Sequence, residues 1–488
     1  MTAKRSKDRR RTIERIRKRW RRRVSTHLCD RGLVTEQVWK AMFLELVEDI
    51  AFAQAEIMMI GDPADEVGID PREPLVWTWC VLDTMPNDHD QRYQALRERA
   101  ADGSGIEDRA EAMRQRGYDM TGLPTAVVLQ VPWLAALARV LDDDLAALQY
   151  WPEDVAGWTP DDWRPPDYEC FVVPVRREHR LADGRPAQRR GLLHHAVIPE
   201  RIGSLRIDLH LHPDAAIHDA GVDPADWVFG SAVFPGMTVV PVETAGDGFR
   251  LVDAPLPGDE AALVSVQVDG AREAGADVAV WPELAMPAGR LDILVARLSA
   301  TPLAGRIPLV VGGSWHVERP PVDDVGVSDA ADGGDRHVNR SEVMLGHGEP
   351  LLSYDKRRRF PYGRLTEDIR TGAVLPVIVM EDRLVGIAIC RDNCDDVAKE
   401  TYRDLPLDLV IVPSMGAGST VEAHERHAKS QRSRQGTVTV VVQQNLVVDG
   451  SVPPAGPAAF SFVRPDEGGR PFAGQAEPFR TLDRAPGA

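Results

Sequence analysis

Three apolar runs in the second half of the chain each lead into one chemically reactive side chain. Glu283 follows the run DVAVWP, Lys356 follows LLSYD, and Cys390 follows VGIAI. Short apolar runs of this length are typical of buried β-strands, and each of these side chains alone would have an ordinary structural role. Together they place a carboxylate, an ammonium and a thiol at strand ends, where they could converge at one edge of a sheet. These groups are suited to covalent hydrolysis of a carbon–nitrogen bond.

The chain around these runs alternates between strand-like and helix-like segments from about residue 228 onward. Amphipathic spacing predicts helices at 262–274, 291–299 and about 422–435. Turn residues predict one hairpin around 347–350 and a second that joins 374–380 to 384–390. This pattern predicts an α/β fold with a mixed sheet layered by helices. The polar, Asp- and Gly-rich stretch 320–340 is expected to be a surface insertion.

The first half of the chain differs in composition from the second. Residues 1–23 hold thirteen Lys and Arg residues and only two acidic ones, and this basic segment could either contact nucleic acid or form a solvated tail. Residues 24–150 read as a mainly helical region, and residues 151–234 as a Trp- and Pro-rich linker with short strands. Residues 235–482 are expected to form the α/β domain.

The bulk composition limits the class of protein. The chain has 488 residues, 43% of them hydrophobic, and a net charge of −17, which disfavours general nucleic-acid binding by the body of the protein. No apolar stretch approaches the ~20 residues needed to span a bilayer. The start of the chain lacks the apolar core of a secretory signal. Five scattered cysteines argue against a disulfide framework, and we expect a cytoplasmic protein.

Several short motifs follow one another in the second half of the chain. They are Gly275-Ala-Asp277, Pro282-Glu283, Gly312-Gly313-Ser314, Tyr354-Asp355-Lys356, Gly386-Ile-Ala-Ile-Cys390-Arg-Asp392, Asp408-Leu-Val-Ile-Val-Pro413-Ser414, Asn445 and Ser461-Phe-Val-Arg-Pro465. In order and spacing, this series resembles the nitrilase superfamily of carbon–nitrogen hydrolases. The resemblance covers about half of the chain, from about residue 235 to 480.

The resemblance implies a four-layer αββα sandwich and a Glu-Lys-Cys catalytic triad. Cys390 would attack a carbonyl or nitrile carbon and form a thioester. Glu283 would accept the thiol proton, pass it to the departing amine, and later activate water. Lys356 would stabilise the oxyanion together with the backbone N–H that follows Cys390, and its charge is expected to lower the thiol pKa. No metal or organic cofactor is required, and members of the superfamily usually form homo-oligomers.

The chain departs from the usual superfamily pattern close to the expected site. Arg364 stands where a second glutamate is usual, so Glu367 is the candidate for that auxiliary role. Five arginines lie in the two loops after the catalytic strands: Arg357, Arg358, Arg359, Arg364 and Arg391. They could select an anionic amide or nitrile substrate, or they could be surface charges. We expect Arg391, Asp392 and Ser414 to contact the substrate.

Two alternatives remain open at the level of sequence. Asp208, His210 and His212 alternate on a predicted strand and could start a metal site, although no further ligand set accompanies them. The nitrilase-like part could also act mainly as an interaction or effector module in a larger assembly, with the basic residues 1–23 on nucleic acid.

Overall fold

A computed structural model describes the parts of the chain that carry the predicted site. The described residues are 159–164, 170–175, 194–212, 227–300, 307–318, 337–380, 382–395, 401–402, 405–435, 437–451, 459–462, 470–471 and 478–482. The predicted basic segment 1–23 and helical region 24–150 lie outside these residues. The chain forms two compact units, and in the first of them only residues 163–164, 170–175 and 194–197 are described.

Short elements precede the α/β part of the chain. Strand β1 (Cys170–Pro174) pairs with β2 (His195–Pro199) in a two-stranded sheet. The described part of the Trp- and Pro-rich segment forms a 3-10 turn, η2 (Pro160–Trp163). Its start is stabilised by Asp162, whose carboxylate accepts the backbone N–H of Thr159 at 2.8 Å. Trp163 is buried, so this segment contributes packing as well as connection.

A seven-stranded sheet in the second unit holds the strand that leads to Glu283. Its strand order is β10 (Trp315–Glu318), β11 (His337–Leu345), β9 (Leu309–Val311), β8 (Val278–Val280), β5 (Phe229–Ala232) and β21 (Phe479–Leu482), with β12 (Pro350–Asp355) also paired to β11. Strands β5, β8 and β9 are parallel, and the other pairs are antiparallel. The predicted hairpin around residue 347 is therefore confirmed as β11–β12.

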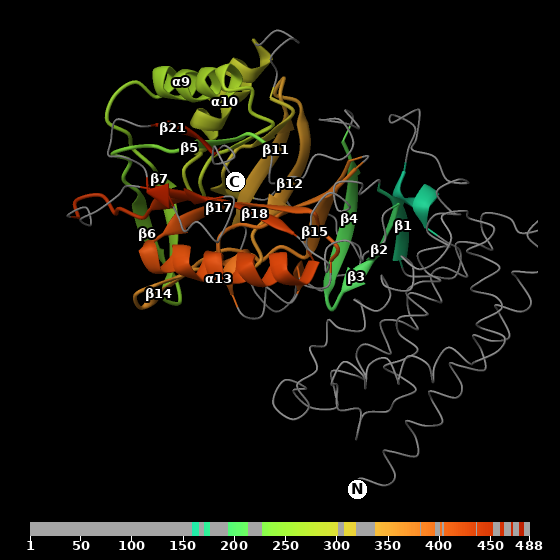
Figure 1. Cartoon of the computed structure of the whole chain (residues 1–488). Coiled ribbons are helices and arrows are strands. Elements are labelled where there is room, and N and C mark those ends of the chain that lie inside the picture. The colour runs from blue at the N-terminus through green and yellow to red at the C-terminus, as the bar shows by residue number, and fades with distance from the viewer. Residues whose placement is uncertain are drawn as a thin grey trace, which may run out of the picture. The chain divides into compact units, whose positions relative to one another are not determined.

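Helices α9 (Glu260–Glu273) and α10 (Ala288–Ser299) lie together over this sheet (Figure 1). The start of α9 is capped by Asp259, whose side chain accepts the N–H groups of Ala261 and Ala262. The buried side chains of α9 recur every three or four residues, which gives the helix one inward face. They are Val264, Gln267, Val268 and Ala271.

An eight-stranded sheet in the same unit carries Cys390. Its strand order is β20 (Arg470–Pro471), β19 (Ala459–Phe462), β18 (Val438–Asn445), β17 (Leu409–Gly416), β16 (Leu384–Ile387), β15 (Val374–Val379), β4 (Leu205–Leu211) and β3 (Arg201–Ile202). Strand β17 is buried along its whole length between parallel neighbours, which explains its nearly continuous apolar sequence. The antiparallel pair β15–β16 confirms the second predicted hairpin.

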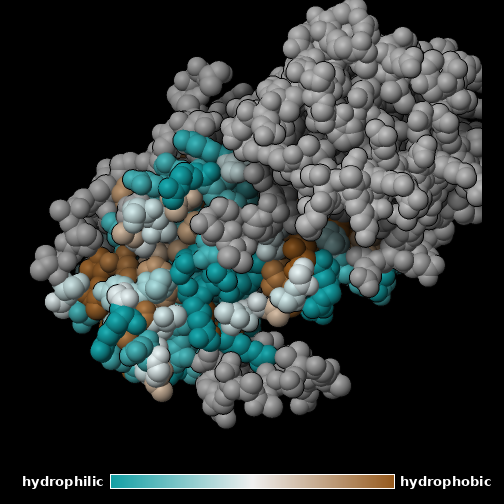
Figure 2. Space-filling model, turned by 90° about the horizontal axis from the view of Figure 1, so that it is seen from below, coloured by the Kyte–Doolittle hydropathy of each residue, from teal (hydrophilic) through white to brown (hydrophobic). Residues whose placement is uncertain are grey.

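Helix α13 (Gly418–Gln435) packs against β17 and β18 (Figure 1). Its exposed positions include Glu422, Arg426 and Lys429. Figure 2, which views the molecule from the side where α13 lies in Figure 1, shows a largely hydrophilic surface there. The buried positions of α13 among those described are also mostly polar, and they are Val421, His424, His427, Ala428 and Gln431. A polar inner face is unusual for a helix and requires hydrogen-bond partners beneath it.

A small four-stranded sheet completes the surroundings of the site. It has the order β13 (Pro361–Tyr362), β14 (Leu365–Glu367), β7 (Gly248–Asp253) and β6 (Val240–Thr244). Strand β14 pairs in parallel with β7, and this pairing sets the position of Glu367. No helix among the described residues is both long enough and apolar enough to cross a membrane.

Two sequence-based boundaries need correction. The predicted domain start at residue 235 is too late, because β4 and β5 precede it and belong to the two large sheets. These strands lie before the catalytic motifs, and their polar turns made them look like part of a linker. The predicted surface insertion 320–340 ends too late, because residues 337–340 begin strand β11. Polar residues give this part of the strand the composition of a surface loop, although Val338 and Asn339 are buried.

Candidate active site

Glu283 follows β8 in a loop that hydrogen bonds from Trp281 and Leu284 hold in place. The indole Nε1 of Trp281 donates to Oε1 of Gln267 on α9 at 2.8 Å. The backbone N–H of Leu284 donates to Oγ of Ser314 at 3.1 Å, and Leu284 has a φ of 52°. A non-glycine residue in this left-handed region needs support from its neighbours. The loop is therefore built to fix the carboxylate, which is 1% exposed.

Gly313 supports this loop by leaving room for it. Its φ is +66°, and a Cβ at this position would lie 2.4 Å from the carbonyl oxygen of Pro282. We predict that Gly313→Ala lowers the free energy of unfolding by about 3 kcal/mol, from left-handed strain and overpacking together. Gly246→Ala is the matched control, because Gly246 has a φ of +71° and nothing within 4 Å. It should lose only about 1 kcal/mol, and equal losses in urea unfolding would contradict the role of the contact.

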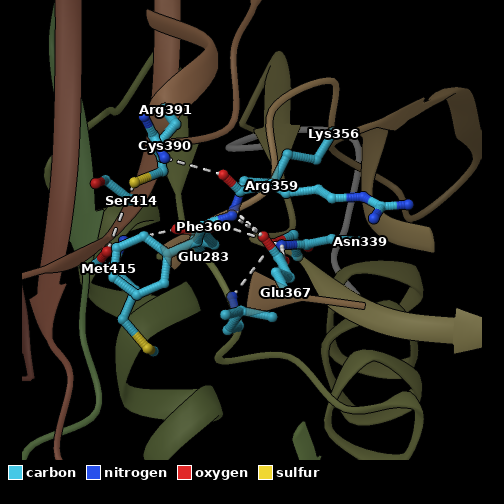
Figure 3. A network of polar contacts seen from close by, with 12 residues as sticks. Glu283, Asn339, Lys356, Arg359, Phe360, Glu367, Cys390, Arg391, Ser414 and Met415 are labelled. Atoms are coloured by element: carbon cyan, nitrogen blue, oxygen red, sulfur yellow. Dashed lines mark hydrogen bonds and ion pairs between the residues drawn. The ribbon is translucent and has the colours of Figure 1, made fainter. Parts of the chain in front are cut away.

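Lys356 lies between two buried carboxylates (Figure 3). Its Nζ donates to Oε1 of Glu283 at 2.6 Å and to Oε2 of Glu367 at 2.7 Å. The lysine follows β12, and its backbone N–H donates to the carbonyl oxygen of Asn339 on β11 at 2.8 Å. The side chains of Lys356 and Glu367 are 0% exposed. Glu283 and Glu367, which lie far apart in the sequence, thus bind the same ammonium group.

Glu367 receives four N–H donors, two on each oxygen. Oε2 accepts from Lys356 and from the backbone N–H of Phe360 at 2.9 Å. Oε1 accepts from Nδ2 of Asn339 at 2.8 Å and lies 2.9 Å from Nε2 of His316. The backbone N–H of Leu251 donates to Nδ1 of His316, so the proton of this imidazole is on Nε2 and points at Glu367. Glu367 has no free lone pair at which to take a proton.

Glu283 has fewer N–H donors than Glu367. Its Oε1 accepts from Lys356 and from Nδ2 of Asn339 at 3.1 Å. Its Oε2 accepts the backbone N–H of Met415 at 3.0 Å, and a hydrogen bond with the thiol of Cys390 is among the influences on the pKa of Glu283. Of the two carboxylates, Glu283 is therefore the one that can act as a proton acceptor.

The pKa values of the two carboxylates also favour Glu283 as the proton acceptor, because one is raised and the other is lowered. Burial raises the pKa of Glu283, and this effect exceeds the opposing pull of Lys356. Burial alone would also raise the pKa of Glu367, but Lys356 and the hydrogen bond from His316 lower it to about 2. Burial would lower the pKa of Lys356, yet the two carboxylates outweigh it and raise that pKa. Paired groups whose pKa values are pushed apart are typical of acid–base sites.

Cys390 sits at a sharp turn between β16 and the short helix α11 (Arg391–Cys394). Its φ of 44° is in the left-handed region, which is costly for a residue with a side chain. The turn is held by the backbone N–H of Cys390, which donates to the carbonyl oxygen of Pro413 at 2.9 Å. The thiol is buried, and its sulfur lies 3.6 Å from the carbonyl oxygen of Met415. Met415 thus contacts Glu283 through its N–H and Cys390 through its carbonyl (Figure 3).

Lys356 acts on the thiol pKa of Cys390 in the expected direction, but the net shift is the opposite of the expected one. Burial first and then the Glu283 carboxylate raise the pKa of Cys390 well above its ordinary value, and together they outweigh the lowering by Lys356. In the resting site Cys390 is therefore a neutral thiol that needs a base when it reacts.

Asp392 holds the loop after Cys390 to the loop after Lys356. It is buried, and its Oδ2 accepts the hydroxyl of Tyr354 at 2.7 Å. Both of its oxygens also accept the backbone N–H of Arg357, at 3.1 and 3.2 Å. These bonds give Asp392 a connecting role between the two loops, and its contact with the substrate stays a prediction.

The arginines near the site are mostly engaged within the protein. Arg391 and Arg358 both bind Asp395, at 2.8 and 2.9 Å. Arg364 is exposed and pairs with Glu243 at 3.3 Å. Buried Arg357 donates to the hydroxyl groups of Tyr354 and Thr401 and stacks on the ring of Tyr402. An anionic substrate would therefore have to compete with Asp395 for Arg391 and Arg358.

Ser414, the third predicted substrate contact, is buried on β17. Its Oγ lies 3.1 Å from Nε2 of His424 and donates to Oε1 of Gln443 at 3.3 Å. The sulfur of Cys390 lies beside Ser414 in Figure 3, and a hydrogen bond from Ser414 is among the influences on the pKa of Cys390. The structure thus places Ser414 against the nucleophile.

The alternative metal site does not assemble. Asp208 and His210 form an ion pair at 3.4 Å on β4, whereas Nε2 of His212 lies 3.3 Å from the carbonyl oxygen of Pro308. Within the described ranges, no group of three or more His, Cys, Asp or Glu side chains is placed to hold a metal ion.

Comparison with known proteins gives matches at the level of structure. No protein-family model matches the chain, and no curated protein matches it either. An amidase from Nesterenkonia sp. AN1, solved as a mutant after Michael addition of acrylamide at its active-site cysteine, matches 53% of this chain and 93% of its own, with 18% identity and a TM-score of 0.33.

Two further solved structures match a similar share of the chain. Nit3 from Saccharomyces cerevisiae, a member of branch 10 of the nitrilase superfamily, matches 53% of this chain and 90% of its own, with 15% identity and a TM-score of 0.35. A glutamine-dependent NAD+ synthetase from Acinetobacter baumannii matches 52% of this chain and 45% of its own, with 16% identity and a TM-score of 0.34.

Proposed function

We propose that the protein hydrolyses a small, non-peptide carbon–nitrogen bond, in an amide, carbamoyl compound or nitrile, through a thioester on Cys390. The observation that carries the proposal is the bridge made by Met415. Its N–H binds the carboxylate of Glu283 and its carbonyl contacts the thiol of Cys390, while Lys356 binds the same carboxylate. A base, a cation and a nucleophile are thereby held in one buried cluster, on three different strand ends.

For an amide, the first half of the reaction forms the thioester. The sulfur of Cys390 bonds to the carbonyl carbon as its proton moves to the carboxylate of Glu283. Lys356 and the backbone N–H of Arg391 stabilise the oxyanion of the tetrahedral intermediate. The carbon–nitrogen bond then breaks, and Glu283 returns the proton to the leaving nitrogen, which departs as ammonia or an amine.

The second half of the reaction releases the acid. Glu283 removes a proton from water as the water oxygen bonds to the thioester carbon. The carbon–sulfur bond breaks, and the sulfur takes back a proton from Glu283, which restores the resting thiol. Glu367 remains an anion throughout, because its four donors leave it no site for a proton, and it offsets the charge of Lys356.

The burial of the site supports a small substrate. Cys390 and Lys356 are 0% exposed and Glu283 is 1% exposed, which leaves no open groove for a polypeptide at these residues. The proposal includes a four-layer arrangement in which α9 with α10 and α13 cover the outer faces of the two large sheets. Homo-oligomer formation stays a prediction.

The direct test compares the wild-type protein with Cys390→Ala. We expect the wild type to release ammonia from at least one compound in a panel of small amides, carbamoyl compounds and nitriles, and Cys390→Ala to release none. We also expect iodoacetamide to modify Cys390 of the wild type, as read by peptide mass spectrometry. Cys394→Ala is the matched control, because Cys394 is four residues away and burial raises its thiol pKa to about 11.

Two outcomes would count against hydrolysis through Cys390. One is equal ammonia release by the wild type and Cys390→Ala across the whole panel. The other is modification of Cys394 in preference to Cys390. Either result would show that the buried cluster does not activate the Cys390 thiol.

A further inference from the structure

Four buried side chains behind the nucleophile form one directed chain of hydrogen bonds. They are Gln443 on β18, Ser414 on β17, His424 on α13 and Asn393 on α11, and each is 0% exposed. Ser414 and Gln443 lie opposite each other in the parallel pair β17–β18. The chain thus joins the sheet, the helix that covers it and the helix that begins at Cys390.

The direction of this chain follows from its fixed end. The carbonyl oxygen of Ala417 can only accept, and Nε2 of Gln443 donates to it at 2.9 Å. The other end of the Gln443 amide, Oε1, must then accept, and the hydroxyl of Ser414 donates to it. The oxygen of Ser414 is left to accept from Nε2 of His424 at 3.1 Å. Nδ1 of His424 consequently accepts from Nδ2 of Asn393, also at 3.1 Å.

His424 is neutral in this arrangement. Burial lowers its pKa to about 3, with a smaller contribution from His427. The imidazole therefore keeps a single proton on Nε2 across the working pH range and always presents it to Ser414. An N–H donor on the oxygen of a hydroxyl also polarises that hydroxyl and strengthens the bond it donates.

The hydroxyl of Ser414 has two acceptors within reach. One is Oε1 of Gln443, at the long distance of 3.3 Å, and the other is the sulfur of Cys390. In the resting site the sulfur is a thiol that lies 3.6 Å from the carbonyl of Met415, so it needs no donor. When Glu283 takes the thiol proton, the sulfur gains negative charge and becomes the better acceptor.

We propose that Ser414 is a catalytic residue whose hydroxyl turns from Gln443 to the sulfur of Cys390 as negative charge develops there, and that neutral His424 is the positioning residue that holds its oxygen. The inference rests on the proposed function of Cys390 as the nucleophile. It assigns to Ser414 an interaction that is stronger with the thiolate than with the thiol, and only such interactions accelerate the chemical step.

The effect of Ser414 on the ionisation of Cys390 has to be measured apart from the effects of the other titratable groups around the sulfur. Glu283, Lys356 and Cys394 act on the pKa of Cys390, and Glu283 acts to raise it. Replacing Glu283 with Gln removes both this carboxylate and the general base. In the Glu283→Gln background the rate of alkylation by iodoacetamide then follows the thiolate fraction of Cys390 alone, so its pH midpoint reports the thiol directly.

The test adds Ser414→Ala to the Glu283→Gln background and follows Cys390 alkylation by iodoacetamide up to about pH 11, because burial holds the thiol pKa above its ordinary value. We expect the midpoint to move up by about one pH unit, and the rate on the rising limb to fall about tenfold, for the loss of one hydrogen bond to a charged group. His424→Leu should shift the midpoint in the same direction. His424→Gln should restore it, because its amide can place a donor where Nε2 was.

The matched control is Ser353→Ala, which removes an exposed serine hydroxyl that donates to Glu342 at 2.6 Å. It should leave the midpoint unchanged. If Ser414→Ala does not fold by circular dichroism, the comparison of His424→Leu with His424→Gln measures the same effect.

Three outcomes would overturn the role of Ser414 and His424. They are a midpoint that Ser414→Ala leaves unchanged, a loss of rate by the same factor at all pH values including the plateau, and equal midpoints in His424→Leu and His424→Gln. Failure of the proposed function would appear differently. The wild type and Glu283→Gln would then be alkylated equally fast at neutral pH, whatever Ser414 does.

Discussion

Lys356→Met should lower the free energy of unfolding by about 3 to 5 kcal/mol near neutral pH, because it leaves two buried carboxylates without their cation. Glu283 and Glu367 would lose the bonds of 2.6 and 2.7 Å to Nζ and would face each other across Asn339. Hydrolysis should fall by at least about 10²-fold, since the oxyanion would lose its cation. Urea unfolding and ammonia release measure the two effects.

The pH dependence of this loss has a definite sign. In Lys356→Met, burial without a cation raises the folded-state pKa values of Glu283 and Glu367 above their unfolded values. The folded variant is then favoured below the unfolded pKa values and loses stability as pH rises through the folded ones. In the wild type the pKa of Glu367 is about 2, so this residue contributes stability above about pH 4 that is lost as pH falls towards 2. The difference between the two proteins should therefore be larger at about pH 8 than at about pH 5.

The control for Lys356→Met is Lys429→Met, which removes a lysine from the exposed face of α13. It should change the free energy of unfolding by less than about 0.5 kcal/mol. Equal stability of Lys356→Met and the wild type at about pH 8 would mean that the two carboxylates are not both ionised in the native protein, and would remove the basis for assigning Glu283 as the base.

The strand ends that carry the site could be predicted from sequence because they are properties of local pattern. The run before Glu283 becomes β8, the run before Lys356 becomes β12, and the run before Cys390 becomes β16 and its turn. Strands β8 and β16 are buried along their whole length, whereas β12 pairs with β11 alone and buries Leu352 and Tyr354. Local pattern also predicted the two hairpins that bring these ends to the same region.

The donors to Glu367 could not be predicted in this way, because they depend on pairing between distant segments. His316 on β10 and Asn339 on β11 are direct partners in the antiparallel register, and both face Oε1 of Glu367. The 18 residues between β10 and β11 that lie outside the described ranges read as a polar insertion, which concealed the start of β11.

The backbone contacts of Met415 and the ion pairs of Asp395 also could not be predicted from the sequence. The N–H and carbonyl of Met415 link Glu283 to Cys390, and any residue except proline at that position would supply them. Asp395 engages Arg358 and Arg391, so a cluster of positive charge in the sequence becomes a set of ion pairs in the structure. The buried histidines of α13 left a sequence signal, since they recur at helical spacing on the inner face.

Glu283→Gln should be a poor hydrolase whose nucleophile ionises more easily than that of the wild type. Loss of the general base should lower the rate of ammonia release by about 10²- to 10⁴-fold. The Glu283 carboxylate is one of the groups that raise the pKa of Cys390, so its neutralisation should lower the pH midpoint of Cys390 alkylation by iodoacetamide. Stability should also fall, by about 1 to 3 kcal/mol, because the single amide oxygen of glutamine can accept either from Lys356 or from the N–H of Met415, which bind different oxygens of Glu283.

These opposite effects on hydrolysis and on ionisation separate a catalytic carboxylate from a structural one. Glu349→Gln is the control, because Glu349 pairs with His347 at the exposed turn between β11 and β12. It should alter neither measurement. If Glu283→Gln kept wild-type hydrolysis, or if its alkylation midpoint rose, Glu283 could not be the group that accepts the thiol proton, and that role would have to pass to a group other than Glu367, whose lone pairs are all occupied.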